Sequence, residues 1–285
     1  MNLDQWILAH EPALRLGAFL GVFTLMALLE AALPRRPRTL PRRARWPHNL
    51  GLVVFNSLLL RLVFPAAAVG VAAYVHQAGW GLIPWLGLSG LPALLLAVVL
   101  LDLAIYLQHV MFHAVPALWR LHRVHHADLD YDVTTGLRFH PIEILLSMVI
   151  KFAVIAALGA PVAAVVAFEV ILNGMAIFNH ANLCLPGKLD RALRLLVVTP
   201  DMHRVHHSVE DDEANSNFGF NLSCWDRLLG TYRAQPRAGH EGMTIGIRTF
   251  RDPKTCATLP GMLLIPFRGP VAGYAINRRR WEEKA

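Results

Sequence analysis

The sequence predicts an all-α integral membrane protein, with four or five transmembrane or hairpin helices and a cytosolic helical cap that holds a histidine-rich dimetal site. Three observations lead to this prediction. The 285-residue chain is 55% hydrophobic and only 16% charged, which is too apolar for a typical soluble domain of this size. It contains several apolar stretches long enough to cross a bilayer. Ten of its 14 histidines fall between positions 109 and 207.

The N-terminal part of the chain, 1–113, is expected to form the first transmembrane helices. Apolar stretches predict one helix over 16–34, a second over 49–75 and a third over 91–113. Six arginines lie in the segment 34–45, between the first two helices. Because arginine-rich loops are translocated poorly, we expect this segment in the cytoplasm.

Two shorter apolar runs, 141–158 and 161–179, are joined by a Gly-Ala-Pro sequence and predict a helical hairpin that ends at 180. Each run reaches about 25 Å at about 1.5 Å per residue, slightly less than a hydrocarbon core of about 30 Å. The hairpin therefore dips into the bilayer and returns, so both of its ends face the cytoplasm.

Two polar regions follow from this topology. The first histidine-rich segment, 114–140, and the C-terminal region with its tail, 181–285, are expected to form the cytosolic part of the protein. We therefore expect a multi-pass protein of a bacterial inner membrane, with the metal site on the cytoplasmic side. Residues 1–15 lack the pattern of a cleaved signal peptide, so the first helix is expected to remain as an anchor.

Charge and cysteine content exclude other classes. The net charge of +7 comes from basic residues that gather beside apolar stretches, which favours contact with anionic lipid headgroups. It does not provide the broad basic face that a nucleic-acid-binding protein needs. The three cysteines, Cys184, Cys224 and Cys256, contain no CxxC pair, so neither a disulfide framework nor a zinc knuckle is expected.

Eight histidines form three compact sequence groups. Spacings of three and four residues bring imidazoles to one face of a helix, where their nitrogens can bind one ion. Eight such ligands are too many for a single ion with four to six ligands, so the count predicts two metals. The groups are His109 and His113; His122, His125 and His126; and His203, His206 and His207.

Four further residues are candidates. His140 and His180 stand at the start and end of the predicted hairpin, and each is interpreted either as a metal ligand or as a hydrogen-bonded interfacial histidine. Asp102 and Tyr106 continue the helical stripe that carries the first histidine group. A carboxylate at membrane depth costs about 2.5–3.5 kcal/mol and needs a partner. We expect Asp102 to support catalysis by orienting a ligand imidazole or by accepting from Tyr106; a structural bond between helices is the alternative.

These residues belong to a longer series of motifs. The series runs Asp102-x3-Tyr106-x2-His109-x3-His113, Trp119-x2-His122-x2-His125-His126, Phe139-His140-Pro141, Asn179-His180, Thr199-Pro200-x2-His203-x2-His206-His207-Ser208, Asn217-Phe218-Gly219, Trp225-Asp226-Arg227 and Gly230-Thr231-Tyr232. In order and spacing it resembles the fatty acid hydroxylase superfamily, also called the sterol desaturase family, of membrane di-iron enzymes. The resemblance covers about half of the chain, from 100 to 232.

The resemblance implies two iron ions held by these histidines, O2 as co-substrate, and hydroxylation or desaturation of a membrane lipid such as a fatty acyl chain or a sterol. The three histidine groups would be the metal ligands, with His140 and His180 as further candidates. The sequence has no dinucleotide-binding glycine signature, haem-attachment motif or cysteine cluster. An external electron donor of the reductase, cytochrome or ferredoxin type is therefore implied.

Two other classes remain as alternatives. A zinc-dependent membrane hydrolase would use a metal to lower the pKa of bound water to about 7, and would need a carboxylate base, but no HExxH motif is present. A non-enzymatic metal transporter or sensor would place its ligands along a transmembrane path, whereas these histidines are expected at one face of the membrane.

Overall fold

The structure is a computed structural model that describes residues 3–271. Within that range the chain is helical, and extended segments pair only as four isolated β-bridges. The predicted all-α class is confirmed. The last part of the predicted tail, 272–285, lies outside the described residues.

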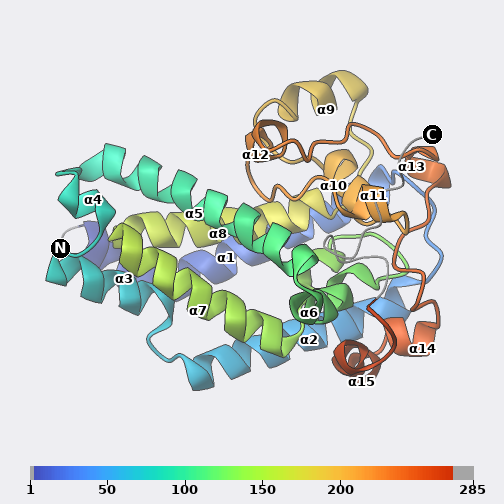
Figure 1. Ribbon diagram of the computed structural model, residues 1–285, viewed down its shortest axis with the longest axis horizontal. Helices are drawn as coiled ribbons and strands as arrows, with labels where there is room; N and C mark the ends of the chain where they lie inside the picture. Colours follow the sequence, from blue (N-terminus) through green and yellow to red (C-terminus); the bar gives the residue numbers. More distant parts are fainter. Residues whose placement is uncertain (1–2, 272–285) are drawn as a thin grey trace.

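Within residues 3–271, five segments are long and apolar enough to cross a membrane. Half of the most apolar window of α8 is buried inside the protein, compared with 6% of that of α1, so α8 is central and α1 faces outward. In Figure 1 these helices form the elongated half of the molecule. They are α1 (Leu3–Ala32), α2 with α3 (Arg42–Val63 and Ala67–Ala78), α5 (Gly90–Ala114), α7 (Pro141–Leu158) and α8 (Val162–Asn179).

The remaining helices, except the short α4 (Leu82–Trp85), gather at one end of this bundle and form the cap (Figure 1). They are α6 (Pro116–His126), η1 (Thr135–Leu137), α9 (Gly187–Leu193), α10 (Pro200–His206), α11 (Asp211–Ala214), α12 (Cys224–Leu228), α13 (Gly239–Gly242), α14 (Pro253–Cys256), α15 (Leu259–Leu264) and η2 (Ile265–Phe267).

The helix predicted over 49–75 is instead two helices, α2 and α3, so this expectation was wrong. Pro65 separates them. A proline has no N–H to continue the ladder, and its ring clashes with the carbonyl four residues earlier, here that of Arg61. Ala67 adopts a φ of 50° at the break. The break gives α3 a new direction beside α7 and α8.

The predicted hairpin is present as α7 and α8, and its turn is set by close backbone contact. Gly159 has a φ of 64°, which favours glycine. A Cβ atom there would lie 2.0 Å from the carbonyl oxygen of Trp80, and one at Gly81 would lie 2.1 Å from the nitrogen of Gly159. Glycine at both positions therefore lets the hairpin turn pack against the segment before α4.

A buried ion network joins α2 to the loop that follows α6. Arg45 Nη2 lies 2.6 Å from Asp128 Oδ2, and Arg45 Nη1 lies 2.6 Å from Asp132 Oδ2. Arg138 Nη1 lies 3.6 Å from the second oxygen of Asp128. The positive charges of Arg45 and Arg138 therefore balance the negative charges of Asp128 and Asp132. Burial alone would raise the pKa of Asp128, but Arg138 and Arg45 together lower it to about 2.

We predict that Asp128→Asn strongly destabilises the fold, because it leaves two buried guanidinium groups short of an anion. Removing one partner of a buried ion pair costs about 3–5 kcal/mol. The control is Glu241→Gln, whose carboxylate is 74% exposed in a pair with Arg35, where about 0–1 kcal/mol is expected. Thermal unfolding of both purified variants measures the difference. Equal midpoints would contradict a supporting role for the network.

Candidate metal centre

Four helices supply histidines from their C-terminal ends. On α5, His113 lies in the last turn. On α6, His125 and His126 lie in the last turn. His180 is the C-cap of α8 and His207 the C-cap of α10. The ends of four helices, from sequence positions far apart, therefore meet at the same place under the cap.

The histidines divide into two groups. In each group one ring nitrogen per residue lies within 4.8 Å of all the others, and every residue is buried. We call them the five-histidine group and the four-histidine group. The first is His109, His113, His122, His126 and His206, and the second is His125, His180, His203 and His207.

Each HxxHH motif is shared between the groups. Residues four apart on a helix lie on one face, whereas adjacent residues point about 100° apart. In the first motif His122 and His126 therefore join the five-histidine group and His125 joins the other. In the second motif the assignment is reversed. His203 and His207 join the four-histidine group, and His206 joins the five-histidine group. The two groups are adjacent, with the rings of His126 and His207 stacked at 4.7 Å.

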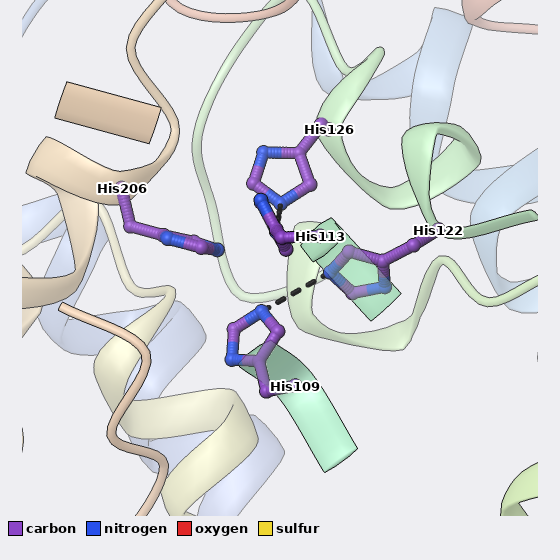
Figure 2. Close-up of side chains that lie close together, drawn as sticks. All are labelled: His109, His113, His122, His126 and His206. Atoms are coloured by element: carbon purple, nitrogen blue, oxygen red, sulfur yellow. Dashed lines mark hydrogen bonds between the residues drawn. The ribbon is translucent and has the colours of Figure 1, made fainter. Parts of the chain in front are cut away.

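Backbone carbonyls fix the protonation of two members of the five-histidine group, His109 and His206. His109 Nδ1 lies 2.8 Å from the Phe218 oxygen, and His206 Nδ1 lies 2.8 Å from the Ser216 oxygen. A carbonyl only accepts, so each Nδ1 carries the proton and each neutral ring leaves Nε2 unprotonated. The Nε2 atom of His206 is buried without a hydrogen-bond partner. Figure 2 shows this ring pointing toward the other four.

A carboxylate fixes His122 in the same way. Glu143 Oε1 lies 2.6 Å from His122 Nδ1. An ionised carboxylate only accepts, so with Glu143 ionised this nitrogen carries the proton. The Nε2 atoms of His109 and His122 then face each other at 3.1 Å (Figure 2). With both protons on Nδ1, two lone pairs meet with nothing between them. That arrangement is repulsive unless a cation binds both.

The four-histidine group has a similar arrangement around His180. Its Nδ1 donates to the Ala176 oxygen at 2.7 Å. Its Nε2 lies 3.1–3.2 Å from the Nε2 atoms of the other three members. Gly136 makes room, because a Cβ there would lie 2.4 Å from the Ala176 oxygen and 2.9 Å from His180 Nδ1. One unprotonated nitrogen cannot satisfy three neighbours, whereas a metal ion can.

The spacing of the nitrogens fits metal ions. At metal–nitrogen distances of about 2.1 Å, ligands at right angles have nitrogens about 3.0 Å apart and opposite ligands about 4.2 Å apart. Burial lowers the pKa of His122 to about 3 and that of His180 to about 3. Imidazoles that stay neutral at pH 7 are suitable ligands for iron, zinc or copper.

His140 lies in neither group. Its Nδ1 accepts from the backbone N–H of Ile142 at 3.2 Å, and its Nε2 donates to the Leu263 oxygen at 3.3 Å. His140 therefore caps the N-terminus of α7 and contacts α15. Of the two isolated histidines, the structure brings only His180 to the other candidates.

The expected contacts of Asp102 are not found. Its Oδ2 accepts from the backbone N–H of Leu222 at 3.1 Å and from Trp225 Nε1 at 2.9 Å. It bonds neither to a clustered imidazole nor to Tyr106. The reason is that the cap folds back along α5, so that Leu222 and Trp225 of the cap donate to the carboxylate. Asp102 thus fastens the cap to the helix.

Tyr106 acts at a distance from the histidines. Its hydroxyl lies 2.8 Å from Thr231 Oγ1, which donates to Asp226 Oδ1 at 2.7 Å. The same oxygen accepts from the backbone N–H of Phe218 at 2.7 Å. The carbonyl of Phe218 orients His109. Tyr106 therefore contributes to the position of a clustered imidazole through three intermediate residues.

Glu143 was not predicted from the sequence. A signal was present, because it is an acidic residue in the first turn of an apolar helix, three positions after His140. Neither feature indicates which histidine it contacts. That contact depends on how α6 packs against α7.

The described site agrees with sequence comparisons. Residues 94–231 match the family model described as fatty acid hydroxylase, which confirms the resemblance seen in the motifs. Ornithine lipid hydroxylase OlsE of Rhizobium tropici is 34% identical over 143 residues, which cover 50% of this chain and 42% of that protein. Alkylglycerol monooxygenase of Homo sapiens is 29% identical over 154 residues, 54% of this chain and 33% of the relative.

Cholesterol 25-hydroxylase of Rattus norvegicus is 25% identical over 145 residues, 50% of this chain and 48% of the relative. The matched region therefore spans less than half the length of each of these three proteins. No solved structure gives a significant match.

We predict that Glu143→Leu weakens metal binding about 10–100-fold, the usual cost of losing a hydrogen-bond acceptor behind a ligand histidine. Glu143→Gln retains an acceptor for His122 Nδ1, so its metal affinity should fall much less than that of Glu143→Leu. Metal retained per chain during dialysis against a chelator measures the difference. A leucine variant that retains metal as well as the parent protein would refute this role.

Proposed function

Because residues 94–231 match the fatty acid hydroxylase family model, we propose that the chain is a membrane di-iron enzyme that uses O2 to hydroxylate a C–H bond of a membrane lipid. The observation that carries the proposal is the pair of adjacent histidine groups. One iron ion would be held by each group, and together they would supply the O2 chemistry that an unactivated C–H bond requires.

The side chains around the histidines support this assignment by excluding water. Phe218 packs against His109, His113 and His206 with ring centroids 5.0–5.5 Å apart. Phe139 stacks on His125 at 4.9 Å. Such an apolar wall keeps the imidazoles neutral and limits side reactions with water.

The position of the groups supports a lipid substrate. They lie where α5 and α8 enter the cap, which places them at the end of the spanning helices, next to one leaflet of the membrane. The relatives act, by their names, on an ornithine lipid, an alkylglycerol and cholesterol. We propose a fatty acyl chain or a sterol as substrate. Hydroxylation is preferred to desaturation because those relatives are hydroxylases or monooxygenases.

The alternatives fit the contacts less well. A zinc hydrolase would need a free carboxylate base, but the carboxylate beside the histidines, Glu143, is bonded to His122. A transporter would need ligands along the spanning helices, whereas both groups lie at one end of them. We also propose that electrons come from a separate reductase, cytochrome or ferredoxin.

The contacts of Arg45 bear on which side of the membrane the metal centre faces. Arg45, from the arginine-rich segment, is bonded within the cap that covers the histidines. Arginine-rich segments stay in the cytoplasm. We therefore propose that the metal centre faces the cytoplasm, in a bacterial inner membrane.

We predict that the two groups lose metal separately. The purified protein should bind about two irons, one in each group. His122→Ala/His126→Ala should lose the iron of the five-histidine group, and His203→Ala/His207→Ala that of the other; either pair should abolish oxidation. His140→Asn keeps a capping side chain for α7 and serves as the control with full iron content. Iron analysis gives the result, and unchanged iron in both double variants would exclude this ligand assignment.

The function itself is tested by comparing membrane lipids from cells that express the protein with those from cells that express His125→Ala. We expect a lipid that gains one oxygen atom, detected by mass spectrometry and dependent on O2. A lipid that instead loses two hydrogen atoms would indicate desaturation. Identical lipids in both strains would reject lipid oxidation.

A further inference from the structure

The cap carries exposed apolar side chains on its α9–α12 side. Leu195 and Leu196 follow α9 and are 70% and 71% exposed. Leu228 and Leu229 end α12 and are 72% and 53% exposed. Isolated surface leucines are common, but four in two short segments form a surface that suggests a partner. We call these four residues the leucine surface.

The two segments that carry it lie side by side. The backbone N–H of Ser223 donates to the Leu196 oxygen at 3.2 Å, and that of Val198 donates to the Asn221 oxygen at 2.9 Å. Ser223 Oγ donates to the Arg194 oxygen at 2.6 Å. Figure 1 shows α9 and α12 next to each other, projecting to one side of the bundle. The leucines therefore belong to one continuous part of the cap.

This part of the cap reaches down the side of a spanning helix. Leu222 and Trp225 bond to Asp102, which precedes the end of α5 at Ala114 by twelve residues. At about 1.5 Å per residue that is about 18 Å from the cap end of the helix. The helix is 25 residues long in all, so the cap contacts it near its middle. The leucine surface is therefore close to the level where α5 is surrounded by lipid.

The exposed charges beside the leucines are positive. Lys188 and Arg191 on α9 and Arg227 on α12 are exposed. The acidic residues of these helices, Asp190 and Asp226, are buried. Leucines next to lysine and arginine are typical of segments that lie in a membrane interface, where the apolar side chains enter the acyl region and the cations meet anionic headgroups.

We propose that the leucine surface inserts into the membrane leaflet nearest the metal centre, with Lys188 and Arg191 facing anionic lipid headgroups. Lipid is the occupant that fits, because the surface belongs to a part of the cap that is bonded to the middle of a spanning helix and its exposed charge is complementary to an anionic leaflet. The cap is then partly embedded in the membrane. This inference does not depend on the reaction that the metal centre performs.

Spin labels on single cysteines test the depth of the surface. Leu228→Cys is labelled with a nitroxide in a Cys184→Ser/Cys224→Ser background, in vesicles of phosphatidylcholine and phosphatidylglycerol. Labels at Leu58, which is 65% exposed on α2, and at Glu241 on α13 serve as membrane and water controls. Collision with O2 and with a water-soluble nickel complex is then compared by electron paramagnetic resonance.

We expect the label at 228 to favour O2 over the nickel complex, as at Leu58, and a label at Leu229→Cys to repeat the result. Nickel accessibility at both positions equal to that at Glu241 would overturn the proposal and leave the surface for a protein partner. Removing phosphatidylglycerol should raise nickel accessibility at 228. Lys188→Gln/Arg191→Gln should abolish that response, and a response unchanged by the substitution would refute the role of the two cations.

Discussion

Facing lone pairs of buried imidazoles are the constraint on which the rest of this structure depends. His109 and His122 point their Nε2 atoms at each other, and the Nε2 atom of His180 faces those of three neighbours. In water such rings would rotate apart or take up a proton. Here burial holds all of these rings in place, and hydrogen bonds on the opposite side of the ring fix His109, His122 and His180. A bound cation would remove the repulsion between the facing nitrogens.

Holding that arrangement requires support from distant parts of the chain. The carbonyl that orients His109 belongs to Phe218, whose own N–H is held by Asp226. The loop after α6 is fixed to α2 by the Arg45 network. These supports are buried and polar, and each is fully compensated by a partner of opposite charge or by a hydrogen bond. Buried polar groups that are satisfied in this way favour one arrangement over others.

Much of this could be predicted from local sequence, and the rest depended on contacts between distant residues. Proline and glycine marked the hairpin turn correctly at Gly159, because turn chemistry is local. The same reasoning overlooked Pro65, since the apolar residues on both sides continue without interruption. Histidine spacing identified the metal candidates but not their division into two groups. The partners of Asp102 and His122 are set by tertiary packing, which spacing along the chain does not show.

The four helices that supply histidines all end at the metal centre, and this has an electrostatic consequence. The C-terminus of a helix carries a partial negative charge of about half an electron. The imidazoles themselves are uncharged, so two divalent ions would be bound without any carboxylate in either histidine group. The converging helix ends of α5, α6, α8 and α10 supply a diffuse negative potential in its place. The backbone would thus offset the charge of bound cations, which neutral imidazoles leave uncompensated, and it would do so with dipoles that no proton can neutralise.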